Sequence, residues 1–105
     1  MGLDMYIFKD DGKRGNDELV YWRKHHNLHY WFEELAIDKG IEFDSFNTVK
    51  VPLTSEDIEA CLEALPEIYD DDEYAEDNIS YTKAQLTPLR FKVGTGLNVY
   101  YDSWW

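Results

Sequence analysis

The sequence predicts an α+β fold, a small and mostly antiparallel sheet packed against two main helices, in a single domain over residues 1–105. Three observations predict it. The chain is 105 residues long, which suits one domain. Hydrophobic residues make up 44% of it and aromatic residues 16%, enough apolar surface for a packed core. Stretches with strand alternation and stretches with helical periodicity follow one another, which indicates both kinds of element.

The first half of the chain predicts a strand, a loop and a long helix. Residues 3–8 alternate in a way that is typical of a strand. Glycines between residues 10 and 16 predict a loop. The spacing of apolar residues then predicts a helix over 18–38, which Gly40 ends. We expect its buried face to consist of Tyr21, His25, Leu28, Trp31, Phe32, Leu35 and Ala36.

The middle of the chain predicts a strand and a second helix. The alternation of residues 41–44 and 48–51 indicates one strand, or a broken pair, that the following proline ends. Thr54 and Asp57 have the spacing of a capping box at a helix start, and Pro66 is expected to stop that helix. Its apolar stripe consists of Ile58, Cys61, Leu62 and Leu65.

The last third of the chain allows two interpretations. Residues 89–101 resemble a hairpin that turns at Gly94-Thr95-Gly96. The alternative is a helix over 81–93, although Pro88 inside it would cost about 3 kcal/mol outside a first turn. In the second case Leu86, Leu89 and Val93 face inward. We expect at least one of the two final tryptophans to be tucked into the core.

The charge of the chain is strongly negative and uneven. The chain has 22 acidic residues against 10 basic ones and a net charge of −12, which argues against direct binding to nucleic acid or to anionic membranes. Residues 51–80 contain eleven acids and neither Lys nor Arg. We predict partner-binding residues in the acidic helix and loop over 54–78: Glu59, Glu63, Asp70, Asp71, Asp72, Glu73, Glu76 and Asp77.

This acidic segment has three possible roles. It can be a solvated surface that keeps the protein soluble. It can be a contact surface for a cationic groove of a protein partner. A divalent-cation loop is the third possibility, but the glycine and the twelfth-position Glu of an EF-hand are missing.

The predicted first helix carries all three histidines, His25, His26 and His29. The i, i+4 spacing of His25 and His29, with Glu33 one turn further, is one at which a helix can offer ligands to a metal. Packing in the core explains the same residues, and so does a ligand pocket, and we predict no metal and no cofactor. An alternative ligand site for a small nucleotide consists of Tyr21, Arg23, Lys24, His29 and Trp104.

Catalytic motifs are missing from the sequence. It contains no GxSxG, Walker or GxGxxG motif. The single cysteine, Cys61, lies on an apolar helical stripe, which favours a core role and fits a reducing compartment. We therefore expect a protein that is not an enzyme.

Several segments resemble a family of small phage and prophage proteins. Members of that family open with MGLDMYL, carry YWRKxNxIHxWF and end near YYxSSW. The corresponding segments here are Met1-Gly2-Leu3-Asp4-Met5-Tyr6, Tyr21-Trp22-Arg23-Lys24, Leu28-His29, Trp31-Phe32 and Tyr100-Tyr101-Asp102-Ser103-Trp104. The resemblance implies a phage or mobile-element origin and action in the cytoplasm of a bacterial host cell. It implies no catalytic residues.

Small size, acidity and many aromatic residues are also common among anti-CRISPR and anti-restriction proteins. The sequence thus predicts a counter-defence inhibitor whose acidic surface blocks the basic nucleic-acid groove of a host nuclease or CRISPR effector. The alternative is a protein that binds a small nucleotide signal through residues 21–32. A homo-oligomer is compatible with either function.

Overall fold

The sheet contains four strands, and alternate residues of its strands point into the core. The computed structural model describes residues 2–10 and 17–105. The strands are β1 (Asp4–Lys9), β2 (Asp17–Arg23), β3 (Val51–Leu53) and β4 (Val99–Trp104). Their order is β2-β1-β4-β3, and every neighbouring pair is antiparallel. The α+β class and the antiparallel sheet predicted from the sequence are confirmed.

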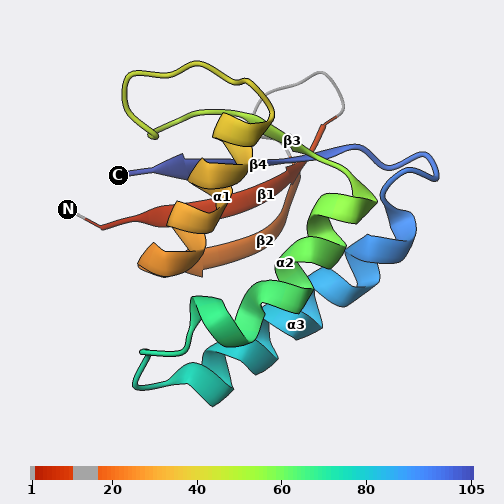
Figure 1. The fold of residues 1–105 in the computed structure, drawn as a ribbon. Coiled ribbons are helices and arrows are strands. Elements are labelled where there is room, and N and C mark those ends of the chain that lie inside the picture. Colours follow the sequence, from red (N-terminus) through yellow and green to blue (C-terminus); the bar gives the residue numbers. More distant parts are fainter. Residues whose placement is uncertain (1, 11–16) are drawn as a thin grey trace.

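The described residues form three helices, which lie against one side of the sheet. They are α1 (His26–Asp38), α2 (Ser55–Ile68) and α3 (Ala75–Lys92). Figure 1 shows α1 across the front of the sheet and α2 and α3 as an antiparallel pair beside it. Burying the apolar sides of these elements drives the fold, because apolar surface leaves water. The buried residues that join sheet to helices include Met5, Ile7, Trp22, Leu28, Phe32, Ile58, Leu65, Leu86 and Tyr101.

The predicted helix over 18–38 is wrong in its first third. Residues 17–23 form β2, in which Val20 and Trp22 point into the core. Lys24 then takes a left-handed backbone conformation with φ 61°, and α1 begins only at His26. The apolar residues of 19–22 fit a period of two as well as a helical face, and pairing with β1 decides between them. The predicted loop over 10–16 lies outside the described residues except for Asp10.

The predicted strand over 41–44 is also wrong, because residues 41–50 form an irregular loop after α1. The strand that does form, β3, contains Pro52 at its centre instead of ending there. β3 is at the edge of the sheet, where a residue without an N–H is tolerated.

The predicted start of the second helix, α2, is confirmed, but its predicted end is wrong. Thr54 and Asp57 form the reciprocal capping box, with the Asp57 N–H donating to Thr54 Oγ1 at 3.1 Å and the Thr54 N–H donating to Asp57 Oδ2 at 2.9 Å. Pro66 lies inside α2, which continues to Ile68 because Ile68 and Tyr69 anchor the last turn in the core. Cys61 is buried on the core side, as predicted.

The hairpin predicted over 89–101 is wrong, and the helical alternative agrees with the structure. Residues 75–92 form α3, with Leu86 and Leu89 buried, and Pro88 lies within the helix. Gly94 and Gly96 turn the chain after α3, with φ 90° and 109°, values that glycine adopts easily. Pro88 is exposed, and the buried leucines on both sides of it outweigh the helix hydrogen bond that a proline cannot make.

The two terminal tryptophans are not tucked into the core. Trp104 is 65% exposed and Trp105 is 43% exposed. The core of this end of the sheet is filled instead by Tyr101, whose ring stacks on that of Phe32 with centroids 4.0 Å apart.

Candidate functional site

A stripe of four glutamates runs along the solvent side of α2. We call Glu56, Glu59, Glu63 and Glu67 the acidic stripe, and all four are exposed. At about 100° per residue they fall within about 80° of the helix circumference and span roughly 16 Å along the axis. The opposite side of α2 holds Ile58, Cys61, Leu65 and Ile68 in the core, so packing fixes the direction in which the stripe points.

No glutamate of the acidic stripe forms an ion pair within the described part of the chain. The ion pairs there join Lys39 to Asp57 at 2.7 Å and Lys50 to Asp10 at 3.2 Å. Neither pair includes a residue of the stripe. Its carboxylates are therefore available to positive charges on a partner.

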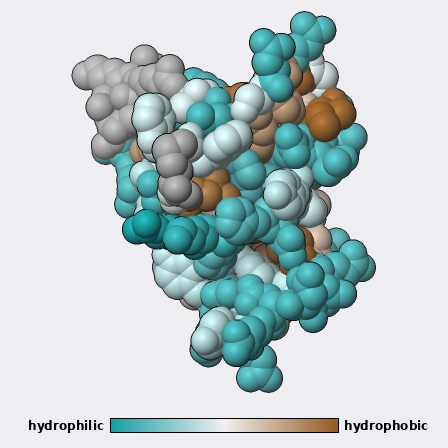
Figure 2. Space-filling model, turned by 90° about the vertical axis from the view of Figure 1, so that its left-hand side faces the viewer, coloured by the Kyte–Doolittle hydropathy of each residue, from teal (hydrophilic) through white to brown (hydrophobic). Residues whose placement is uncertain are grey.

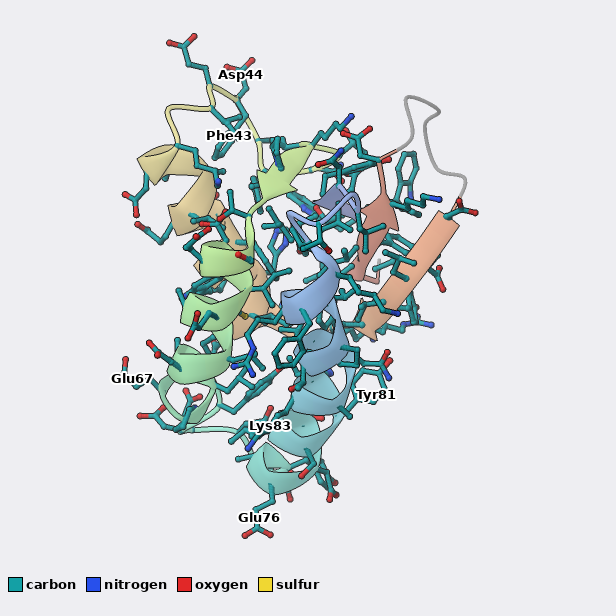
Figure 3. All side chains as sticks on the ribbon, turned by 90° about the vertical axis from the view of Figure 1, so that its right-hand side faces the viewer. Phe43, Asp44, Glu67, Glu76, Tyr81 and Lys83 are labelled. Atoms are coloured by element: carbon teal, nitrogen blue, oxygen red, sulfur yellow. The ribbon has the colours of Figure 1, made fainter. Side chains whose placement is uncertain are left out.

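The loop between α2 and α3 extends the stripe. We call Asp70, Asp71, Asp72, Glu73, Glu76 and Asp77 the acidic end. Figure 3 shows Glu67 and Glu76 pointing away from the protein near the lower ends of α2 and α3. The face drawn in Figure 2 is mostly hydrophilic in its lower part, where this loop lies. The structure thus brings all eight predicted partner-binding residues onto α2, this loop and the first turn of α3.

Hydrogen bonds order the acidic end. Asp72 accepts from the Tyr74 backbone N–H and from Asn78 Nδ2, both at 2.8 Å, and these donors hold the pKa of the Asp72 carboxyl below its usual value. Asn27 Nδ2 donates to Asp71 Oδ1 at 3.0 Å and to the Ile68 carbonyl at 3.1 Å. The loop is thereby tied to the start of α1. Glu76 and Asp77 lie in the first turn of α3, where negative charge is favourable.

Sequence reasoning missed two members of the stripe, Glu56 and Glu67. The four-residue spacing of Glu59, Glu63 and Glu67 was the signal that could have found the second. It was hidden because Pro66 was expected to end the helix before Glu67.

The alternative ligand residues are only partly brought together. Tyr21, Arg23 and Trp104 lie on the side of the sheet away from the described helices, where Arg23 and Trp104 flank Asp4 on either side of β1. Lys24 follows β2 and lines a small hollow with His25 and Asp71. His29 is separated from this set, because it is buried between α1 and the core side of β4. The predicted ligand residues therefore do not share one helix, since Tyr21 and Arg23 lie on β2 and His29 lies on α1.

The sheet side that carries Tyr21 is rich in aromatic rings. The Tyr6 ring stacks on Phe8 with centroids 5.0 Å apart, and its centroid lies 5.3 Å from that of the Tyr21 ring. Phe8 in turn contacts Tyr100 at 5.6 Å. Tyr21 donates a hydrogen bond to Asp4 Oδ1 at 2.6 Å, and this bond raises the pKa of the Tyr21 hydroxyl.

His25 belongs to a chain of hydrogen bonds that crosses the core. Its Nδ1 lies 2.7 Å from the Tyr69 hydroxyl, which lies 3.2 Å from Thr82 Oγ1. Trp22 Nε1 donates to the same Thr82 oxygen at 3.0 Å. Burial lowers the pKa of His25. These contacts join β2, α2, α3 and the start of α1, which gives His25 a structural role.

His29 is also held by a tyrosine. Its Nδ1 lies 2.6 Å from the Tyr101 hydroxyl, and its ring packs on Phe46 with centroids 4.9 Å apart. Burial lowers the pKa of His29 to about 4. Each of the two histidines thus bonds to its own tyrosine. Among residues 2–10 and 17–105, no three His, Cys, Asp or Glu side chains are placed to hold a metal ion together.

The buried histidines predict how stability depends on pH. The pKa of His29 is about 4 in the folded protein and about 6.5 when exposed, so the unfolded chain takes up a proton first as the pH falls. The stability that the protein gains by burying neutral His29 is fully present above pH 6.5. It is lost progressively as the pH falls from 6.5 to 4. We expect urea midpoints to fall between pH 7.5 and 5, and His29→Phe to flatten this dependence. His26→Gln, at an exposed position, serves as the control and should retain it.

Comparisons with known proteins add no relative. No protein-family model matches the chain, and neither the curated proteins nor the solved structures contain a match. Of the helices in the described ranges, none has the length and apolar character needed to cross a membrane.

Proposed function

We propose that this protein is a non-enzymatic counter-defence inhibitor of phage origin. Its acidic stripe and acidic end occupy a basic groove in which a host nuclease or a CRISPR effector binds nucleic acid. The observation that carries the proposal is the acidic stripe: four exposed carboxylates on one side of α2, none of which forms an ion pair among the described residues.

The carboxylates of the stripe are spaced to fit a partner surface that normally binds phosphates. Glu59, Glu63 and Glu67 follow one another at four residues, which is about 6 Å along a helix. Neighbouring phosphates on one DNA strand are about 7 Å apart in space, because each advances about 3.4 Å along the duplex and also rotates around its axis. Lysine and arginine side chains are long enough to adapt to this small difference. Carboxylates so spaced can therefore take the place of phosphates against a row of cations.

The ordered acidic end lowers the cost of binding. Asp71 and Asp72 are already fixed by Asn27, Tyr74 and Asn78, so less side-chain and loop entropy is lost when a partner arrives. Such an arrangement favours a stable complex over a transient electrostatic encounter.

Capture from a bacterial lysate tests this function. We expect the immobilised protein to retain a host protein with a basic nucleic-acid groove, and we expect DNA or RNA of that protein's own substrate type to compete for it. Replacing Asp70, Asp71 and Glu73 by Asn and Gln should weaken capture. Retention of a partner that nucleic acid does not displace would contradict the proposal.

A second candidate function has one observation in its favour. Tyr21, Arg23 and Trp104 share the aromatic side of the sheet, where a nucleobase can stack and a phosphate can meet Arg23. Calorimetric titration with cyclic and linear nucleotides separates the two candidates. A counter-defence inhibitor should not bind free nucleotides. Nucleotide binding that is abolished by Arg23→Ala or Trp104→Ala would support the second candidate function.

A further inference from the structure

A cavity of about 420 Å³ opens between the first half of α1 and the loop that follows it. His29, Tyr30 and Glu33 line it from α1, Asp44 and Phe46 from the loop, and Trp105 from the end of the chain. Neither the predicted partner-binding residues nor the aromatic side of the sheet contribute to it.

Two of the lining residues, Trp105 and Phe46, are held in place by contacts with the rest of the protein. Trp105 is 43% exposed, yet three hydrogen bonds hold it. Its Nε1 donates to the Phe46 carbonyl at 2.9 Å, its backbone N–H donates to Asn47 Oδ1 at 3.0 Å, and its carbonyl accepts from Asn47 Nδ2 at 3.1 Å. Phe46 is buried between His29 and Phe43. A tryptophan held in this way forms a wall for a ligand, because its conformational entropy has been lost before binding.

The charged residues that line the cavity are all acidic. Glu33 and Asp44 are its acidic lining residues, and its lining includes neither Lys nor Arg. Burial keeps His29 neutral at pH 7, since its pKa is about 4. Anions are therefore repelled, and a group with positive charge is favoured.

Aromatic rings in the same lining also favour a cation. Tyr30 is 56% exposed beside the carboxylate of Glu33, with Trp105 and Phe46 in the same lining. Faces of Trp, Tyr and Phe attract ammonium and guanidinium groups, and the same rings cover an aliphatic stem. A bare metal ion is a poorer fit, because it prefers several oxygen ligands to aromatic walls.

We propose that this cavity binds an organic cation, a guanidinium or ammonium group on an aliphatic stem. The charged group lies near Glu33 and Asp44, and the stem packs against Phe46, Tyr30 and Trp105. The cation comes either from an Arg or Lys side chain of a protein partner or from a free amine. Figure 3 places Asp44 at the upper end of the protein and Glu67 and Glu76 at the lower end, so this site is separate from the acidic surface and does not depend on the proposed function.

Titration with small probes tests the proposal. N-acetyl-arginine methylamide and N-acetyl-trimethyllysine methylamide represent side chains, and spermidine represents free amines. We expect saturable binding by calorimetry and a shift of the Trp105 indole N–H signal in NMR spectra. N-acetyl-citrulline methylamide, the neutral equivalent of the arginine probe, should not bind. Tighter binding of the amino-acid probes than of spermidine would assign the site to a protein partner, and the reverse order to a free amine.

Substitutions locate the binding. Glu33→Gln and Asp44→Asn should each weaken it about tenfold, the effect expected when a charged hydrogen-bond partner is lost. Glu34→Gln, the adjacent exposed residue on α1, removes the same charge outside the cavity and should leave the affinity unchanged. Equal binding of the citrulline probe, equal loss in the Glu34→Gln variant, or failure of every cationic probe to bind would overturn the proposal.

Discussion

Replacing Phe32 by alanine is expected to lower the free energy of unfolding by about 3–5 kcal/mol, the range for truncating a buried aromatic residue. Phe32 joins α1 to the sheet. Its ring centroid lies 4.0 Å from that of Tyr101, on which it stacks, and 6.2 Å from that of Trp22. The truncation leaves a cavity that these large neighbours cannot fill by small movements. Urea unfolding followed by circular dichroism measures the loss.

The control for this change is Phe32→Leu, which keeps most of the side-chain volume. We expect it to cost roughly 1–2 kcal/mol, because the buried apolar surface is largely preserved. A Phe32→Ala variant less than about 1 kcal/mol below the native protein would show that α1 does not depend on this contact, contrary to the packing described above.

Replacing Thr82 by valine has the second-largest expected effect. Valine has nearly the shape of threonine but lacks the hydroxyl, so the buried indole N–H of Trp22 loses its acceptor and Tyr69 loses a neighbour. An unsatisfied buried donor costs about 1–3 kcal/mol. The loss should appear as a lower urea midpoint at pH 7.

Thr82→Ser tests whether the hydroxyl is responsible. It keeps the oxygen and removes a methyl group, so it should retain the hydrogen bond from Trp22. We expect Thr82→Ser to be more stable than Thr82→Val. The reverse order would mean that the methyl group contributes more to stability than the hydrogen-bond chain from Trp22 to His25.

The parts of the fold that the sequence predicted well are those with one strong local signal. The alternation over residues 3–8 predicted β1, and the capping box at Thr54 predicted the start of α2. The parts it predicted badly depend on contacts far along the chain. Residues 17–23 become a strand because β1 lies beside them, and Pro66 and Pro88 remain inside helices because buried neighbours hold the flanking turns.

The candidate sites divide in the same way. The acidic surface could be predicted, because a run of acids without bases is visible in the sequence and exposure follows from charge. The cavity beside Trp105 could not. It needs α1, the loop at Asp44 and Phe46, and the end of the chain to meet. The two hydrogen bonds between Asn47 and Trp105 join residues 58 positions apart.

We propose that the acidic stripe, and not net charge alone, recognises a basic partner. The most direct measurement compares two variants of equal net charge against the partner captured from lysate. One carries Gln at Glu56, Glu59, Glu63 and Glu67. The other carries Gln or Asn at four exposed acids elsewhere: Glu18, Glu34, Asp38 and Glu42.

We predict that the stripe variant binds about tenfold or more weakly, since four surface ion pairs worth up to about 1 kcal/mol each are lost. The control variant should bind almost as the native protein does. The native affinity should fall as salt rises, and that of the stripe variant should fall less, because screening acts on the charges that have been removed. Equal losses in the two variants, or a native affinity that does not respond to salt, would contradict the claim.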